Sequence, residues 1–402
     1  MKNIELLAPA GDFEKLQMAI AYGANAVYLG GSNYSLRANS KNFDTEELEQ
    51  AIAYAHNKGV KIYVAVNIFA HNTDLEGLPE YLQTLKNIGA DAVIVADPGI
   101  FNIATQVKGL EVHISTQANV TNYQSALFYH QLGAKRIVLA RELTFKEIIK
   151  FSQGPYDIEA FVHGAMCMSY SGRCLLSNFM TDRDANQGNC SQPCRWKYAI
   201  AEEKNPGEYM PIFEDERGTY IMNSKDLCMI EHIPQLIDSG VTSFKIEGRM
   251  KSAYYVALVT RAYREAIDDY LKDPELYIRK KSYYVEELKK TSHREFFTGF
   301  YFGTPSNGQN TEKNGYNSEK EFIGLIKNYD HETGIALVEQ RNKFSLGEEI
   351  EIIRSSGEKS FNQKVEVLLN MDNTPVESAP HAQEMLYLKV NEPVNIFDII
   401  CK

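Results

Sequence analysis

The amino-acid sequence predicts an α/β protein: a (β/α)8 TIM-like barrel with a cysteine-rich insertion after strand 7, followed by a small C-terminal all-β barrel domain. Three observations predict this fold. Short aliphatic runs alternate with amphipathic helical segments over about the first 250 of the 402 residues. About 80 residues separate the seventh run from the eighth, where the other units need about 25. After about residue 275 the pattern changes to short alternating strands with turn residues between them.

Eight β-branched or aliphatic runs qualify as the barrel strands. They are Leu6–Ala8, Ala26–Leu29, Ile62–Val66, Val93–Val95, Val112–Ile114, Ile137–Leu139, Ile158–Val162 and Phe244–Ile246. In the first unit, Asp12 can cap the following helix and Gly23 suits the left-handed position at its end. Eight units fill a closed barrel, whereas an open doubly wound sheet usually has fewer strands. Apolar side chains at helical spacing between Tyr255 and Tyr270 predict the last helix of the barrel.

Two domains are expected from these patterns. The barrel is assigned to residues 1–275, with the insertion at about 163–242, and 276–317 form a connecting segment. Residues 318–402 form the small β-barrel accessory domain. Its predicted strands are Phe322–Ile326, Ile335–Val338, Ile350–Ile353, Val365–Leu369 and Met385–Val390.

The composition indicates a cytoplasmic protein. No segment approaches the ~20 apolar residues that span a bilayer, which excludes a membrane protein. The N-terminus runs directly into a strand pattern and lacks the apolar region of a secretory signal.

The net charge of −11 argues against broad, non-specific binding to nucleic acid, because such binding rests on neutralising phosphates. A local basic surface is still compatible with this charge. The cations between Arg279 and Arg294 are interleaved with Tyr283 and Tyr284, so this segment could contact an RNA backbone and stack bases. The alternative is a solvated helix face beside a small core.

Four cysteines of the insertion are candidate metal ligands: Cys167, Cys174, Cys190 and Cys194. In a reducing compartment, clustered cysteines are more often ligands or catalytic groups than disulfides. Their spacing is Cys-x6-Cys-x15-Cys-x3-Cys, which suits four thiolates on one iron–sulfur centre. Tetrahedral zinc uses the same number of ligands and stays open as the alternative. Cys228 and Cys401 have no such spacing and are expected to pack as small hydrophobes.

Polar residues at the ends of the predicted strands should converge on the barrel mouth, where barrel enzymes have their active sites. The candidates for catalysis are His113, Gln117, His163 and Glu247, and those for substrate binding are Asn67, Arg141, Lys245, Arg249 and Lys251. Each could equally be a satisfied structural residue. The segment Lys245–Lys251 is the strongest, because three cations around one carboxylate favour an anionic ligand. The motifs of zinc proteases, serine hydrolases, phosphate loops and dinucleotide-binding folds are absent from the sequence.

Several segments resemble one known family. Residues Glu159–Cys167 and Gly172–Ser177 resemble the signature of the collagenase-like peptidase U family, of the U32 type. Leu7–Gly11, Ser115–Gln117, Leu139–Glu142 and Lys245–Lys251 also look like that family, so the resemblance spans most of residues 1–270. The C-terminal module resembles the family's short accessory domain.

This resemblance implies an enzyme, and despite the family's peptidase name its better understood members are hydroxylation proteins acting on RNA or on ubiquinone precursors. They hold a [4Fe-4S] cluster through four cysteines that map onto Cys167, Cys174, Cys190 and Cys194. The chain is most similar to members that form 5-hydroxyuridine at the wobble position of tRNA with prephenate as a required metabolite. The implied partner is the anticodon region of tRNA, and a paired family subunit stays open.

Two other functions stay open. One is a metal-dependent collagenase-like peptidase, motivated by the family's name. The other is a non-enzymatic RNA-binding scaffold in which structural zinc braces the insertion. If a [4Fe-4S] cluster is present, four cysteines satisfy every iron, which favours electron transfer or structural support over Lewis-acid chemistry.

Overall fold

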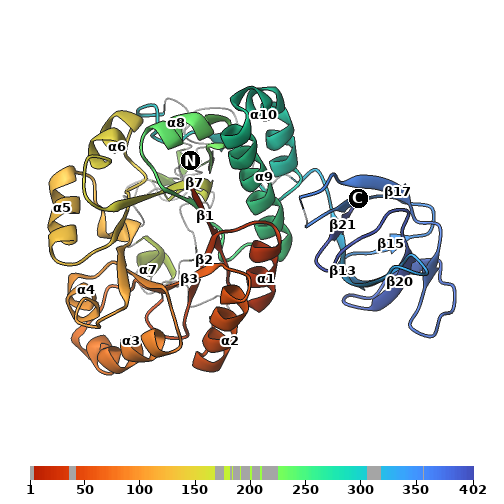
Figure 1. Cartoon of the computed structure of the whole chain (residues 1–402), viewed down its shortest axis with the longest axis horizontal. Helices are drawn as coiled ribbons and strands as arrows, with labels where there is room; N and C mark the ends of the chain where they lie inside the picture. Colours follow the sequence, from red (N-terminus) through yellow and green to blue (C-terminus); the bar gives the residue numbers. More distant parts are fainter. Residues whose placement is uncertain are drawn as a thin grey trace.

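A closed barrel of eight parallel strands forms the larger domain of the computed structural model (Figure 1). The structure describes residues 4–35, 42–167, 176–181, 183, 191, 200–201, 209–210, 225–305, 318–355 and 357–402. The barrel strands are β1 (Glu5–Pro9), β2 (Ala26–Gly30), β3 (Lys61–Val66), β4 (Ala92–Val95), β5 (Glu111–Ile114), β6 (Arg136–Val138), β7 (Asp157–Ala165) and β11 (Ser243–Ile246). Strand β11 pairs with both β1 and β7 and thereby closes the barrel. The predicted barrel and its eight strand positions are confirmed.

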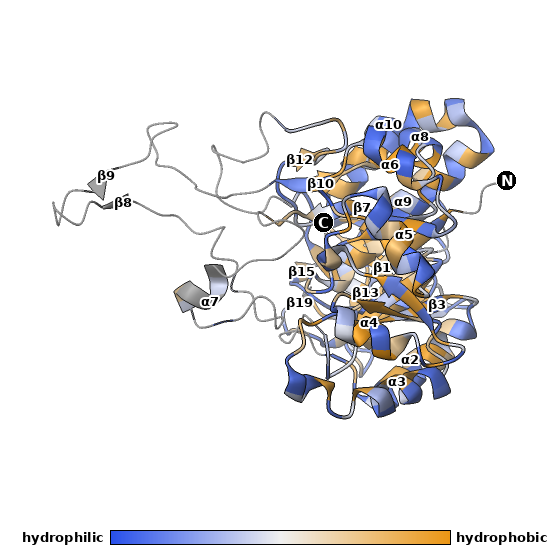
Figure 2. Cartoon of the chain, turned by 90° about the vertical axis from the view of Figure 1, so that its left-hand side faces the viewer, coloured by the Kyte–Doolittle hydropathy of each residue, from blue (hydrophilic) through white to orange (hydrophobic). Residues whose placement is uncertain are grey.

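Helices surround the barrel on its outside (Figure 1). They are α1 (Phe13–Ala21), α2 (Thr45–His56), α3 (Leu78–Asn87), α4 (Pro98–Ala104), α5 (Tyr123–Gln131), α6 (Phe145–Phe151), α8 (Ile233–Asp238), α9 (Ala253–Lys272) and α10 (Pro274–Lys289), and a short helix α7 (Leu176–Thr181) lies in the insertion. As predicted, the Asp12 side chain caps α1 by accepting from the backbone N–H of Lys15, and Gly23 adopts a φ of 99° after it. Strands are mainly hydrophobic in Figure 2, and many outer helix residues are hydrophilic. Among the described residues, no helix is both long and apolar enough to cross a membrane.

Strand β7 runs three residues beyond its predicted end at Val162. Its last residues pair antiparallel with β10 (Asp226–Cys228), which in turn pairs with β12 (Phe296–Phe297). This added pairing satisfies the backbone of β7 past the point where β11 ends. The first residues of the insertion therefore leave from a strand that is held on both sides.

Charged side chains fill part of the barrel interior. Arg136 on β6 donates to Glu5 on β1 and to Glu159 on β7, with N–O distances of 2.5 and 3.0 Å. Lys245 on β11 donates to the other oxygen of Glu159 at 2.7 Å. Burial raises the pKa of Glu159, but Lys245 and Arg136 outweigh burial and hold that pKa at about 2. The network therefore links four strands through ionised groups.

The C-terminal domain is a curled antiparallel sheet with its own apolar core. Its seven strands, in spatial order, are β17 (Phe361–Lys364), β16 (Glu349–Ile353), β21 (Ile399–Cys401), β13 (Phe322–Asp330), β14 (Ile335–Gln340), β20 (Met385–Lys389) and β18 (Leu368–Leu369), and β15 (Phe344–Ser345) pairs separately with β19 (Ser378–Ala379). The single strand predicted at Val365–Leu369 is wrong. In its place β17 ends at Lys364 and β18 begins at Leu368, on opposite edges of the sheet.

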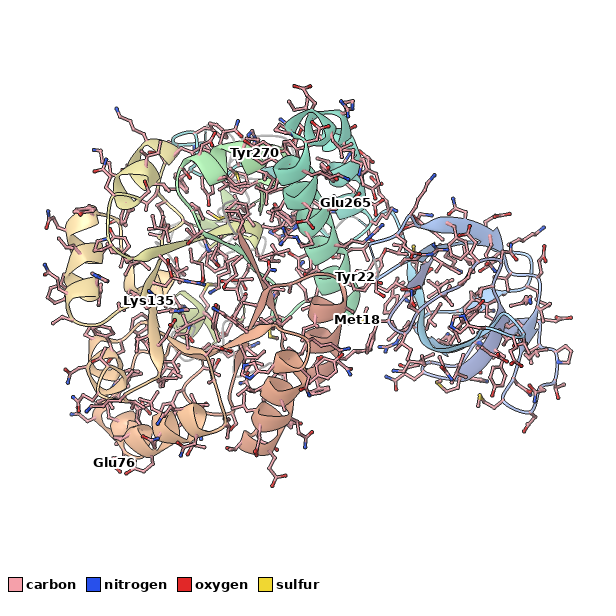
Figure 3. The ribbon with its side chains drawn as sticks, viewed as in Figure 1. Met18, Tyr22, Glu76, Lys135, Glu265 and Tyr270 are labelled. Atoms are coloured by element: carbon pink, nitrogen blue, oxygen red, sulfur yellow. The ribbon has the colours of Figure 1, made fainter. Side chains whose placement is uncertain are left out.

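Helices α1 and α9 hold the C-terminal domain against the barrel. Met18 and Tyr22 lie on the flank of α1 that faces this domain (Figure 3). The Tyr22 hydroxyl lies 3.1 Å from the carbonyl of Ile353 and 2.9 Å from that of Phe397. Cys401 is fully buried in the same apolar contact, as expected for a small hydrophobe, and burial raises the pKa of its thiol to about 12.

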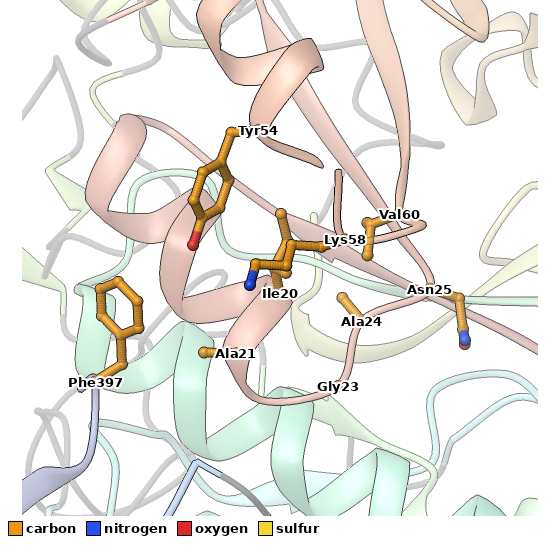
Figure 4. Close-up of a pocket in the computed structure, with 9 residues that line it drawn as sticks. All are labelled: Ile20, Ala21, Gly23, Ala24, Asn25, Tyr54, Lys58, Val60 and Phe397. Atoms are coloured by element: carbon orange, nitrogen blue, oxygen red, sulfur yellow. The ribbon is translucent and has the colours of Figure 1, made fainter. Parts of the chain in front are cut away.

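A hollow of about 400 Å³ opens at this junction, with Tyr54, Lys58 and Phe397 among its lining residues (Figure 4). Its other lining residues include Asn25 and Val60, which directly precede β2 and β3. The hollow therefore lies at the amino-terminal end of the strands. The active sites of barrel enzymes lie at the opposite end, so the candidate site has to be built elsewhere.

Candidate active site at the barrel mouth

An arginine–glutamate pair spans three neighbouring strand ends at the mouth. Arg141 follows β6, and its Nη2 donates to Oε2 of Glu247 after β11 at 2.9 Å. Its Nη1 donates to the carbonyl of Ala165 at the end of β7 at 2.8 Å. The guanidinium also lies 3.8 Å from the centroid of the Phe161 ring. Both charged side chains keep some exposure, 12% for Arg141 and 17% for Glu247, so the pair borders the open mouth.

A pair of amides lies at the ends of β3 and β5. Asn67 donates through Nδ2 to Oε1 of Gln117 at 2.7 Å, and both residues are partly exposed. The Ser115 side chain begins the turn that carries Gln117 by accepting from its backbone N–H at 3.3 Å. Amide side chains offer both donors and acceptors, which is the chemistry that reads the edge of a nucleobase.

Arg249 is buried beside the loop that follows β2. Its Nη1 donates to Oγ of Ser35 at 2.9 Å, and its Nη2 donates to Oδ1 of Asn42 at 2.8 Å. A Cβ on Gly30 would lie 2.2 Å from Nη2 of Arg249, so only glycine leaves room for the guanidinium there. Arg249 thus links Ser35 and Asn42, which follow β2 in the chain, to the segment after β11.

Two of the predicted site residues lie deeper, inside the barrel. Lys245 is 4% exposed and is bound to Glu159, with the Tyr28 ring centroid 4.4 Å from its ammonium. His113 is buried against the edge of the Tyr63 ring, and burial lowers the pKa of its imidazole. Both residues lie deeper in the barrel than the Arg141–Glu247 and Asn67–Gln117 pairs, and interior contacts hold both of them.

His163 faces away from the barrel interior. The register shifts between Lys245, which pairs with Phe161, and Ile246, which pairs with His163. The resulting bulge turns His163 toward the aromatic rings of Tyr255 and Tyr263 on α9, whose centroids lie 6.0 and 5.5 Å away. Lys251, the last predicted binding residue, lies nearby, with its Nζ 5.1 Å from the Tyr255 ring centroid and 3.3 Å from the carbonyl of Ser292.

Burial sets the protonation of His163. It lowers the pKa of the imidazole to about 3, and the charges of Lys251 and His293 act in the same direction. The ring is therefore neutral at physiological pH. It lies against Phe296 as well, at a centroid distance of 5.5 Å, so its surroundings are those of a packed core residue.

Of the four predicted metal ligands, the structure describes Cys167, which is exposed two residues past β7. Cys174, Cys190 and Cys194 lie outside the described residues. Cys167 is close in sequence to Ala165, whose carbonyl binds Arg141, so a centre that uses this thiolate would lie beside the Arg141–Glu247 pair. Cys228 differs, because burial raises the pKa of its thiol to about 12.

Three residues of this region were not predicted. Phe161 is two positions from Glu159, so strand alternation alone places both on the inner face and could have identified Phe161. Ser35 and Asn42 belong to a loop without periodicity, and no sequence signal pairs them with Arg249.

The basic segment of α10 is already bound to acidic side chains. Lys280 binds Glu265 and Asp269 at 3.0 and 2.8 Å, and Lys290 binds Glu287 and Glu351 at 2.7 and 2.6 Å. Tyr284 is fully buried. These contacts favour a helix packed on its neighbours over a surface that stacks RNA bases.

The comparisons with known proteins cover both domains. The model described as peptidase family U32 matches residues 11–311, and that of the peptidase family U32 C-terminal domain matches residues 318–400. The chain belongs to peptidase family U32. The resemblance predicted from the sequence is thereby confirmed.

Relatives of this chain carry names of two kinds, RNA hydroxylation and collagenase. The tRNA hydroxylation protein P1 of Bacillus subtilis is 41% identical over 400 residues, which cover 98% of this chain and 93% of that protein. The 23S rRNA 5-hydroxycytidine C2501 synthase of Escherichia coli is 36% identical and covers 73% of this chain and 44% of that protein. A protein of Porphyromonas gingivalis named collagenase is 33% identical and covers 99% of this chain and 97% of that protein.

Proposed function

We propose that this U32 protein hydroxylates the wobble uridine of tRNA to 5-hydroxyuridine at its barrel mouth, in the cytoplasm. The observation that carries the proposal is the near full-length similarity, at 41% identity, to a tRNA hydroxylation protein. The similarity to an rRNA hydroxycytidine synthase supports the broader class of RNA base hydroxylation. The barrel mouth is partly exposed and holds the amides of Asn67 and Gln117, which suit the edge of a base, and the guanidinium of Arg141, which suits a phosphate.

The residues at the mouth have separable tasks in this proposal. The amides of Asn67 and Gln117 hydrogen-bond the edge of the flipped uracil. Arg141 fixes the carboxylate of Glu247 beside the base, where this carboxylate can accept a proton. Prephenate is the proposed required metabolite, and its two carboxylates suit arginine and lysine side chains of the predicted binding set.

A [4Fe-4S] cluster is the proposed cofactor, with Cys167, Cys174, Cys190 and Cys194 as its ligands. The exposed Cys167 thiol at the mouth is the structural feature that supports this assignment. When bound, such a cluster supplies one-electron transfer.

Peptidase activity is the weaker candidate. One relative is named collagenase, but the two histidines predicted for catalysis, His113 and His163, are only 1% and 2% exposed. A general base has to lie within hydrogen-bond reach of the substrate proton that it removes. Both imidazoles are buried in the described part of the chain, which leaves the partly exposed Glu247 as the candidate base for either activity, and the tRNA hydroxylation protein is the more similar relative, at 41% identity against 33%.

The proposal is tested in cells that lack this protein. Mass spectrometry of nucleosides from their tRNA should show the loss of 5-hydroxyuridine and its derivatives, and wild-type protein supplied in trans should restore them. Unchanged 5-hydroxyuridine in the deletion strain would refute the function. Anaerobic purification with iron, sulfide and zinc assays tests the cofactor separately, and a protein that holds zinc without iron would refute the cluster.

A further inference from the structure

A second hollow, of about 390 Å³, lies beside the mouth at the start of α5. Its wall consists of the turn from Ala118 to Val120 and of Gln124, Ser125, Phe128 and Tyr129 on the helix. The volume is within the range of about 300–1,000 Å³ that is usual for sites of small organic groups. None of the residues that line the hollow belongs to the Arg141–Glu247 pair or the Asn67–Gln117 pair.

The wall of the hollow and the amide pair belong to one turn. Gln117, which binds Asn67, directly precedes Ala118. The carbonyl of Val120 accepts from the backbone N–H of Ala140 at 3.3 Å, next to Arg141. One turn therefore joins the wall of this hollow to Gln117 along the chain and, by a backbone hydrogen bond, to the residue before Arg141.

The chemistry of the wall fits a nucleobase. The Phe128 ring is 57% exposed and meets the Tyr129 ring at an edge, with centroids 5.6 Å apart. Tyr129 is in turn fixed by an edge contact with Phe101 at 5.4 Å. The amides of Asn119 and Gln124 add hydrogen-bonding groups beside these rings. An aromatic face with amides around it is the usual surface for an unstacked base in single-stranded RNA.

We propose that this hollow, formed by Asn119, Gln124, Phe128 and Tyr129, binds a base next to the modified one in the RNA loop. The proposal rests on the proposed function and names a part of its substrate. Taking a base out of a stacked loop leaves its neighbours unstacked, and an exposed ring at the rim replaces the lost stacking. The amides then favour bases whose edges match them.

The test measures hydroxylation of a tRNA anticodon stem-loop by the full-length protein with its cofactor. Phe128→Ala should raise KM about tenfold, the lower range of what one stacked base contributes. Phe128→Trp should restore it, because it retains an aromatic face. Leu132→Ala is the matched control: Leu132 is 51% exposed on the same surface but does not line the hollow, so its KM should equal that of wild type.

RNA variants identify the base. Two stem-loops are compared, each lacking the base on one side of the wobble nucleotide. One of the two should bind the wild-type protein about tenfold more weakly than the intact stem-loop does. Phe128→Ala should bind this abasic RNA as well as it binds the intact stem-loop, since the two changes remove the same contact. Full additivity, or a wild-type KM for Phe128→Ala, would overturn the proposal.

Two further outcomes are distinguishable. If wild-type protein restores no 5-hydroxyuridine in cells and modifies no stem-loop, the proposed function fails, and this inference fails with it. If light scattering shows that Phe128→Ala and Leu132→Ala both dissociate an oligomer of the wild type, the surface is a protein interface and the base-binding proposal is overturned.

Discussion

Arg141 and Glu247 join the ends of β6 and β11 across the strand that lies between them. Their N–O distance is 2.9 Å, and the second guanidinium nitrogen of Arg141 holds the carbonyl of Ala165 on the intervening β7. One planar group thus sets the spacing of three strand ends at the mouth. Lysine has a single ammonium and cannot keep both contacts in the same plane.

Arg141→Lys is therefore expected to lower the rate of tRNA hydroxylation at least tenfold, equal to about 1.4 kcal/mol, while the protein stays folded. Mass spectrometry of 5-hydroxyuridine after complementation measures the effect. Arg354→Lys is the control, because Arg354 in the C-terminal domain also bridges two carboxylates, those of Glu358 and Glu392. Wild-type activity of Arg141→Lys would show that the pair has no role in catalysis.

Lys245→Met is expected to destabilise the fold. In this variant the fully buried Glu159 keeps, among the described residues, only Arg136 as a cationic partner. Removal of one partner from a buried ion pair lowers the free energy of unfolding by about 3–5 kcal/mol. Urea unfolding measures the loss. The double variant Lys245→Met with Glu159→Leu should recover part of it, since no unpaired charge stays buried. A stable but inactive Lys245→Met protein would instead support direct binding of substrate by Lys245.

The residues that sequence analysis placed correctly follow from regular repeats. Alternating runs and helical spacing fix the eight barrel strands, and the position of a residue just after a strand brings Arg141 and Glu247 together at the mouth. These inferences need only the period of each element and the parallel order of the strands. They do not need knowledge of any side-chain contact.

The residues that could not be placed depend on irregular features. Simple alternation puts His163 on the same face as Glu159 and Phe161, but a bulge at Val162 turns it outward to α9. The short strand Ile399–Cys401 was not predicted, because its partners β13 and β16 are distant in sequence and no βα repeat marks it. Partners such as Ser35 and Asn42 for Arg249 come from a loop conformation, which no local pattern encodes.

Cys167→Ser is expected to abolish iron binding. Cys167 is exposed two residues past β7, and its replacement would remove one of the four thiolates of the proposed cluster. Iron and sulfide assays of anaerobically purified protein measure the outcome. Cys228→Ala is the control and should keep its iron, because the Cys228 thiol has a pKa of about 12 and donates no thiolate. Equal iron content in both variants would exclude Cys167 as a ligand.

His163 is expected to make the fold sensitive to acid. Its pKa is about 3 in the folded protein because of burial and the charges of Lys251 and His293, against an ordinary value of 6.5. Between these two values the unfolded chain binds one more proton than the folded one. Stability is therefore full above about pH 6.5 and is lost as the pH falls toward 3, at up to about 1.4 kcal/mol per pH unit.

His163→Gln removes the group that takes up this proton on unfolding. Between pH 6 and pH 4 the free energy of unfolding of the variant should therefore fall less steeply than that of the wild type, with slopes that differ by about 1.4 kcal/mol per pH unit. Urea unfolding at several pH values gives the slopes. The rings of Tyr255, Tyr263 and Phe296 surround the site, so a lower stability of the variant at pH 7 is compatible with the prediction, and only the slope decides it. His331→Gln, at an exposed position in the C-terminal domain, is the control and should keep the wild-type slope. Equal slopes for wild type and His163→Gln would mean that the imidazole takes up a proton without unfolding, and the packed position of His163 would then be wrong.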